Sequence, residues 1–244
     1  MATAVQETAR RSPREVRRWL AVGGLAFLAL GAGTAGAIYG DLPGVGDATA
    51  RIKAELRAHH SRSVLVRPDE RVARAVVAIE DKRFFHHGAI DPIAIARAIG
   101  TTITHGPVDP GGSTIAQQLA KVLYREPGSV GGSLRSIGLA FKLEAHYSKP
   151  AILSMYLNAV YFGHDFYGIE QASQGYFGRA PGNLTWAQAS LLAGLPQAPS
   201  AFDPLRHLQA ARARQHEVLA QLVAQHAITA SGARRIAAEP LRLR

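Results

Sequence analysis

The longest uncharged segment of the sequence lies near its N-terminus. From Trp19 to Tyr39, 21 consecutive residues carry no charge and most of them are apolar. About 20 such residues form a helix long enough to cross the roughly 30 Å hydrocarbon core of a bilayer. Aromatic residues at both ends favour the two membrane interfaces. The pattern therefore predicts one transmembrane helix over residues 19–39.

The charges beside this segment predict its orientation. Residues 1–18 contain five arginines and two glutamates, and basic residues accumulate on the cytoplasmic side of membrane helices. We therefore expect residues 1–18 to form a cytoplasmic basic arm, with everything after Asp41 outside the cytoplasm. The alternative is a cleaved signal peptide. Its apolar region usually has only about 7–15 residues, which favours a retained anchor.

The rest of the chain shows mainly helical periodicity. Residues 40–48 are rich in proline and glycine and are typical of a linker, which leads to one domain over residues 49–244. Within it, a short strand is expected at residues 63–66. Helix start and stop signals predict helices at residues 69–85, 92–99, from Ser113 onward, 134–146, 149–157, 185–196 and 203–223. The sequence thus predicts a mainly α-helical domain.

Composition narrows the choice of chemistry and of partner. The chain has 28 basic and 18 acidic residues, and outside the N-terminal arm 23 basic face 16 acidic residues, a net charge of +7. A surplus of this size favours an anionic partner. Because nucleic acid is scarce outside the membrane, anionic lipid headgroups or a lipid-linked phosphate are the expected partners. The absence of cysteine excludes a disulfide scaffold, a thiolate zinc site and a cysteine nucleophile.

Glu80 is the first candidate for catalysis. It follows a run of apolar and small residues and is soon followed by two phenylalanines. A carboxylate in such surroundings can be partly desolvated, which makes it a better general base. The alternative is an ordinary helix end where charges meet solvent. The histidine pairs 59–60 and 86–87 do not have the spacing of metal ligands, because adjacent helical residues do not share a face.

A second candidate segment runs from Gly111 to Lys121. Ser113 is a suitable N-cap, and the amides of the helix that follows could meet an anionic or hydroxyl-rich ligand. The expected polar face of this helix contains Thr114, Gln117, Gln118, Lys121 and Arg125. The alternative is a face that only contacts solvent.

Together these segments resemble a known family. EDxxFxxH at residues 80–87 and GGSTIxQQ at residues 111–118 resemble glycosyltransferase family 51, the transglycosylase domain of peptidoglycan synthases and penicillin-binding proteins. Further matching motifs lie at residues 143–149, 152–163, 168–178 and 191–199. The likeness covers roughly residues 60–205. Because only about 40 residues follow it, the resemblance is to a monofunctional enzyme without a transpeptidase domain.

The resemblance implies a lysozyme-like helical domain on the outer face of the bacterial inner membrane. Such enzymes polymerise lipid II by transferring the glycan chain on undecaprenyl pyrophosphate to the 4-hydroxyl of another lipid II. Glu80 matches the catalytic base. The implied substrate contacts are Asp81, Phe84, His87, Arg97, Ser113, Thr114, Gln117, Gln118 and Lys121.

The resemblance also implies partners. These are lipid II, the growing glycan strand, membrane lipid and other cell-wall synthesis proteins, and no nucleic acid. Some members of the family use a divalent cation, Mg²⁺ or Mn²⁺, with the pyrophosphate. The sequence contains no dedicated metal site and requires no cofactor.

The sequence departs from the family pattern at its second acidic residue. Where the family has RKxxE, this chain has Gly132, Ser133 and Ser136. Glu144 lies eight residues further on, about 12 Å along a helix, and cannot simply substitute. Two alternatives therefore stay open beside the active enzyme. One is a weak or inactive relative that binds lipid II as a scaffold. The other is a lysozyme-like hydrolase, against which Lys121 and Arg97 argue, because a hydrolase holds no pyrophosphate.

Overall fold

The computed structural model describes residues 36, 39–61, 69–96 and 112–244. Nearly all of the predicted anchor, the expected strand at 63–66 and Arg97 lie outside these ranges. Among the described residues, no helix is both long and apolar enough to cross a membrane. The chain divides into two units, Met1–Leu42 and Pro43–Arg244. The second unit contains the candidate site.

The second unit is built from helices, which confirms the predicted class. The α-helices are α2 Ala48–Ala58, α3 Glu70–Glu80, α5 Ile115–Tyr124, α6 Val130–His146, α7 Lys149–Ala159, α8 Gly168–Phe177, α9 Trp186–Gly194, α10 Leu208–Ala224 and α11 Ala230–Ala238. Short 3₁₀ helices lie at Phe84–His86 (η1) and Pro181–Asn183 (η2), and a helix begins at residue 92. In the described part of the chain there is no strand, only one isolated bridge between Tyr161 and Tyr167.

Local capping explains where several helices begin. Thr185 caps α9 as predicted, with Gln188 completing a capping box. The prediction that Ser113 caps α5 is wrong by one residue, because the N-cap is Thr114. With Thr114 as the cap, Gln117 stands at the third helical position and completes a second capping box. The helix expected over 69–85 ends at Glu80, where Asp81 leaves helical geometry.

The C-terminal helices differ most from expectation. The last long helix begins at Leu208 instead of residue 203, because the Asp203 carboxylate accepts the amide of Leu205 in a turn. The sequence analysis missed α11, although Thr229 accepts the amide of Gly232 and gives it an ordinary N-cap. α6 begins at Val130, earlier than the predicted residue 134, because Gly131 and Gly132 near its start concealed the helical pattern.

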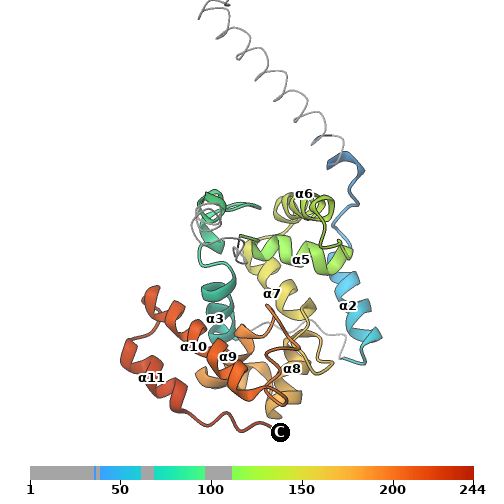
Figure 1. Ribbon diagram of the computed structural model, residues 1–244. Coiled ribbons are helices and arrows are strands. Elements are labelled where there is room, and N and C mark those ends of the chain that lie inside the picture. The colour runs from blue at the N-terminus through green and yellow to red at the C-terminus, as the bar shows by residue number, and fades with distance from the viewer. Residues whose placement is uncertain (1–35, 37–38, 62–68, 97–111) are drawn as a thin grey trace, which may run out of the picture. The chain divides into compact units, whose positions relative to one another are not determined.

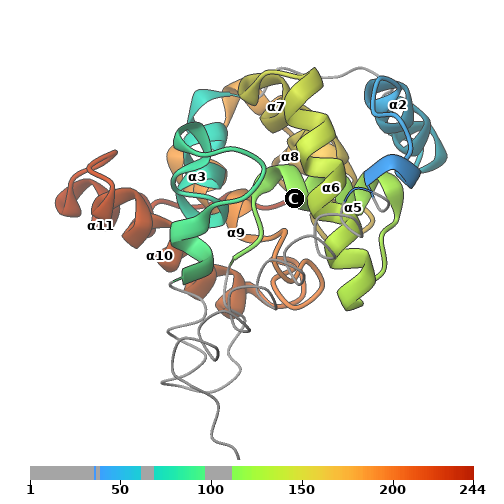
Figure 2. The ribbon, with the colours of Figure 1, turned by 90° about the horizontal axis from the view of Figure 1, so that it is seen from above.

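Two groups of helices meet at the site. α3 packs against α9 and α10, and α5 packs against α6 and α7 (Figures 1 and 2). The core between them is apolar, with fully buried Phe84, Leu119 and Leu191. The C-terminal end of α3 reaches the N-terminal end of α5, since Asp81 accepts the amide of Ile115. The site lies at this meeting point.

The start of α6 offers a test of the fold with neighbouring glycines. A Cβ atom on Gly132 would lie 2.0 Å from the carbonyl oxygen of Pro127, whereas one on Gly131 would lie 4.0 Å from its nearest neighbour. We expect Gly132→Ala to lower the free energy of unfolding by about 1–3 kcal/mol because the backbone must move. Gly131→Ala should be neutral or stabilise by up to about 1 kcal/mol. Urea denaturation of both variants compares them, and equal stabilities would contradict the packing at Gly132.

Candidate active site

Glu80 is the last residue of α3 and lies where two cavities adjoin. A cavity of about 420 Å³ and a smaller one of about 180 Å³ share Ile79, Glu80, Gly112 and Ser113 in their walls. The Glu80 side chain is only 10% exposed. The expectation that this carboxylate is partly desolvated is therefore confirmed, and the alternative of an ordinary solvated helix end is wrong.

Side chains from three other helices surround Glu80. Gln118 of α5 donates its amide Nε2 to Glu80 Oε2 at 2.9 Å, and Nη2 of Arg214 in α10 lies 3.9 Å from Oε1. Tyr156 of α7 donates its hydroxyl to Gln118 Oε1 at 3.0 Å. Burial, and secondarily the charge of Glu80, raises the pKa of Tyr156 well above its usual value, so this hydroxyl keeps its proton.

The sequence analysis missed Arg214. Its guanidinium lines the larger cavity, donates to the carbonyl oxygen of Gly194 at 3.3 Å, and pairs with Glu217 at 2.5 Å. No motif marks this arginine. The signal that could have identified it is its place in α10, where it lies on the inward face with Ala211 and Val218. A charged residue on an apolar face normally has a buried partner.

The predicted polar face of α5 is only partly correct. Gln118 and Lys121 line the larger cavity, but Thr114 and Gln117 are buried. Thr114 Oγ1 and Gln117 Nε2 both donate to the carbonyl oxygen of Ala89, at 2.9 and 3.2 Å. The amides of Ile115 and Gln117 are bound by Asp81 and Thr114. These two amides are therefore not free to bind a ligand. The expectation that they could meet an anionic ligand is wrong.

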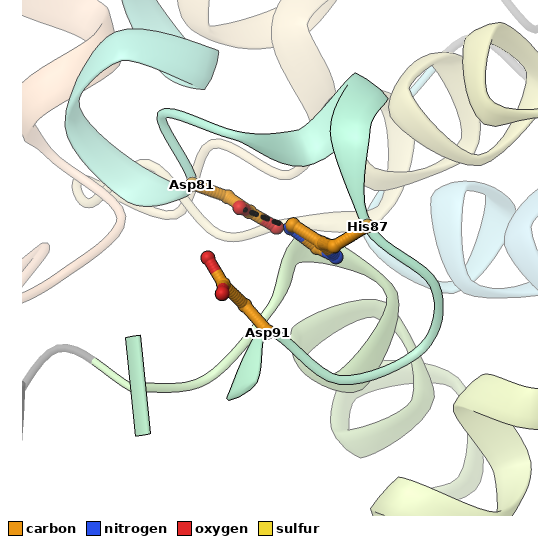
Figure 3. Close-up of side chains that lie close together, drawn as sticks. All are labelled: Asp81, His87 and Asp91. Carbon is orange, nitrogen blue, oxygen red and sulfur yellow. Dashed lines mark hydrogen bonds and ion pairs between the residues drawn. The ribbon is translucent and has the colours of Figure 1, made fainter. Parts of the chain in front are cut away.

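The side chains of Asp81, His87 and Asp91 lie close together (Figure 3). His87 Nε2 lies 2.7 Å from Asp81 Oδ1, and His87 Nδ1 lies 2.5 Å from the carbonyl oxygen of Gly88. Each ring nitrogen of His87 therefore faces a hydrogen-bond acceptor. The second oxygen of Asp81 accepts the amide of Ile115. This cluster therefore joins the EDxxFxxH segment to the start of α5.

Both carboxylate oxygens of Asp91 accept hydrogen bonds from the protein, as those of Asp81 do. Its Oδ2 accepts from Arg83 Nε at 3.0 Å, and Oδ1 accepts from the amides of Ile93 and Ala94 at the start of the helix. The hydrogen bond from Arg83, followed by the backbone and charge interactions, lowers the pKa of Asp91 to about 2 against the opposing effect of burial. Although ligand atoms of Asp81, His87 and Asp91 lie within 4.8 Å of one another, protein donors already engage them. Within the described ranges, this donor set does not fit a divalent cation.

The remaining sequence candidates divide between cavity and core. Ser113 lines both cavities. Phe84 is completely buried, with Lys149 Nζ 4.4 Å from its ring centroid. Lys149 also pairs with Glu144 at 2.7 Å, so Glu144 belongs to this packing contact. Phe84 and His87 line neither cavity.

Ser136, which stands where the family has its second acidic residue, is 1% exposed. Its hydroxyl donates to the carbonyl oxygen of Ser133 at 2.7 Å, and the residue lines neither of the two cavities. It shares the buried face of α6 with Leu139 and Leu143. The serine side chain therefore packs in the interior of the domain.

The fold and the site define a mainly helical domain whose polar cleft is centred on one buried glutamate. The comparisons with known proteins identify its family. The Transglycosylase family model matches residues 50–223, and the chain belongs to this family, the transglycosylase domain of glycosyltransferase family 51.

Curated relatives match this domain over part of their length. The chain is 40% identical over 155 residues to penicillin-binding protein 1C of Escherichia coli (strain K12), covering 64% of this chain and 20% of that protein. It is 41% identical over 162 residues to penicillin-binding protein 1A of Aquifex aeolicus (strain VF5), covering 66% and 22%. A crystal structure of penicillin-binding protein 1A from Haemophilus influenzae matches with 33% identity and a TM-score of 0.38, over 40% of this chain and 15% of that chain. The chain thus spans about a fifth of the length of these curated relatives.

Ser136→Glu tests whether the missing carboxylate can be restored directly. Because the position is buried on a packed face, we expect the variant to lose about 2–4 kcal/mol of stability at neutral pH. Desolvation raises the pKa of a buried carboxyl, so the loss should be smaller at acidic pH, where the group is neutral. Thermal denaturation at two pH values measures this, with Ser231→Glu at an exposed helix start as the control. A Ser136→Glu variant as stable as the control would show that this position opens to the cleft.

The lowered pKa of Asp91 predicts acid sensitivity. Its folded-state pKa of about 2 lies below the ordinary aspartate pKa of 3.8, so its contribution to stability is present above about pH 4 and is lost as the pH falls toward 2. Asp91→Asn keeps an N-cap but removes the charge. It should cost about 1–2 kcal/mol at pH 7 and flatten the stability profile below pH 4. Asp47→Asn, in an exposed pair with Arg51, is the control. If wild type, Asp91→Asn and Asp47→Asn lost stability in the same way below pH 4, the role of Asp91 in acid sensitivity would be contradicted.

Proposed function

We propose that this chain is a peptidoglycan glycosyltransferase. It would transfer the glycan chain carried on undecaprenyl pyrophosphate to the 4-hydroxyl of lipid II. Membership of the Transglycosylase family supports this class of reaction. The observation that carries the proposal is the position of Glu80, a buried carboxylate in the shared wall of two cavities. The adjoining cavity space leaves room for a reacting group beside this carboxylate.

In this proposal Glu80 is the general base. The amide of Gln118 donates to it and Arg214 lies 3.9 Å away, so both neighbours favour its ionised form. An ionised carboxylate can accept the proton of the attacking hydroxyl as the new glycosidic bond forms. Asp81 and Asp91 also line the smaller cavity, but both of their carboxylates accept hydrogen bonds from the protein. Glu80 is therefore the carboxylate best suited to this role.

The larger cavity suits the leaving group. Lys121 and Arg214 both line it, together with the hydroxyl residue Ser113. A departing pyrophosphate carries negative charge that fixed cations stabilise, and such preorganised charges contribute strongly to catalysis. This arrangement supports transfer from a phosphate-linked donor more than hydrolysis of finished glycan.

The proposal includes the untested expectations from the sequence. The domain would be lysozyme-like, and residues 19–39 would anchor it on the outer face of the bacterial inner membrane. Arg97, which lies outside the described residues, would be a further substrate contact. Lipid II and the growing strand would be its ligands, membrane lipid would surround the anchor, and other cell-wall synthesis proteins remain candidate partners.

A second candidate function is a lipid II-binding scaffold with little or no turnover. The observation that favours it is Ser136, because the family's second acidic residue is replaced by a buried serine. Among the described residues that line the two cavities, no other carboxylate is placed to take its role, since Asp81 and Asp91 are engaged. The two functions differ in turnover and not in the ligand that they bind.

Polymerisation of lipid II by the purified full chain in detergent tests the proposal. Wild type should give glycan polymers resolved by length, and Glu80→Gln should reduce the rate by at least about 100-fold because the base is lost. Glu70→Gln is the matched control, since Glu70 lies exposed at the other end of α3.

Other outcomes identify the alternatives. Saturable lipid II binding without polymer, in several detergents and with or without Mg²⁺, would contradict the enzyme and support the scaffold. Release of soluble fragments from finished peptidoglycan would identify a hydrolase.

A further inference from the structure

We propose that Tyr156 is a positioning residue that acts on Glu80 through the side-chain amide of Gln118. The inference rests on the proposed role of Glu80 as a base. Tyr156 lies in α7, Gln118 in α5 and Glu80 in α3. Two hydrogen bonds connect them, from the tyrosine hydroxyl to Gln118 Oε1 at 3.0 Å and from Gln118 Nε2 to Glu80 Oε2 at 2.9 Å.

The direction of these two hydrogen bonds gives Tyr156 its role. A glutamine amide has a donor end and an acceptor end, and a half-turn about its last bond exchanges them. While Tyr156 donates to the oxygen, the NH₂ group faces Glu80 and stabilises the ionised carboxylate. In the reversed orientation the amide oxygen would face Glu80, which is favourable only when Glu80 is protonated. The tyrosine hydroxyl therefore selects the amide orientation that suits a base.

Burial makes this selection effective. Tyr156 is 1% exposed, so a hydroxyl without its partner there would lose a hydrogen bond that water does not easily replace. Desolvation, and then the charge of Glu80, raises the pKa of Tyr156, so the hydroxyl is protonated throughout the range in which a glutamate titrates. It can therefore serve as a constant donor while the charge on Glu80 changes.

The other charged groups near Glu80 must be held constant in any test. Arg214 is one such group, a cation with Nη2 3.9 Å from Glu80 Oε1. Four more titratable or charged groups line the same cavities as Glu80. One lies in α5, two directly follow Glu80 in sequence, and one precedes the helix that begins at residue 92. They are Lys121, Asp81, Lys82 and Asp91. Among the described residues, no hydrogen bond joins any of these groups to Tyr156, so Tyr156→Phe leaves them in place.

The experiment compares the protonation of Glu80 in wild type and Tyr156→Phe. In the full chain in detergent micelles with ¹³C-labelled glutamate, the Glu80 carboxyl signal is assigned by its loss in Glu80→Gln and is followed over pH. Without the tyrosine donor the amide can reverse, the ionised form loses stabilisation, and the titration midpoint should rise by about half to one pH unit. The acidic limb of kcat/KM for lipid II polymerisation should move upward by the same amount.

A double-mutant cycle distinguishes an effect through Gln118 from a direct one. Gln118→Met removes the amide at similar length, and in that background Tyr156→Phe should change the Glu80 midpoint no further. A full additional shift would overturn the proposal, because Tyr156 would then act on Glu80 directly.

Tyr176→Phe is the matched control for the loss of a buried hydroxyl. Tyr176 is fully buried and donates to the carbonyl oxygen of Phe162 at 3.0 Å, with no contact to Glu80. It should lose stability without moving the titration of Glu80. If Tyr156→Phe fails to fold, Gln118→Met alone must still raise the Glu80 midpoint.

The two readouts separate the inference from the proposed function. If the wild-type protein makes no polymer, the proposed function is contradicted. The titration of Glu80 in wild type and Tyr156→Phe still tests whether Tyr156 affects the Glu80 carboxylate. An unchanged Glu80 midpoint in folded Tyr156→Phe overturns the inference even if polymerisation is robust.

Discussion

The carboxylate of Asp81 is the interaction on which the rest of the site depends. One of its oxygens accepts the first amide of α5 at Ile115, and the other contacts His87. These bonds fix the end of α3 against the start of α5, and the contacts of Thr114 and Gln117 with Ala89 reinforce the same junction. Because Glu80 immediately precedes Asp81, the junction also fixes where its side chain lies. Gln118, in the first turn of α5, is then within hydrogen-bond distance of it.

A carboxylate as buried as Glu80 is costly unless its charge is compensated. Part of the compensation comes from Arg214 in α10, which follows the last of the recognisable motifs. The guanidinium is in turn oriented by Gly194 at the end of α9 and by Glu217. The family match continues to residue 223, beyond the motif likeness that ends near residue 205, and so includes most of α10. The charge at the centre of the site requires the helix that carries its counterion.

Local signals in the sequence predicted the helical class and the cap at Thr185, and they left the burial of Glu80 open beside a solvated helix end. They depend on nearest neighbours along the chain, which a sequence displays directly. Long-range contacts were not predictable in this way. Gln117 looked like part of a polar face, but its amide binds Ala89, and the place of Arg214 beside Glu80 depends on how α10 packs. Ser136 was recognised as a departure from the family, but only the packing of α6 shows that it points inward.

Glu80 and Asp81 show why residue type alone does not determine a role. They are adjacent carboxylates, yet both oxygens of Asp81 are engaged, one by the amide of Ile115 and the other by the imidazole of His87. Glu80 faces cavity space, a side-chain amide that can reverse and a guanidinium at 3.9 Å. A proton on Asp81 would disrupt the junction between α3 and α5, whereas a proton on Glu80 could be accommodated by reorienting one amide. The environment thus gives the first carboxylate a chemical role and the second a structural one.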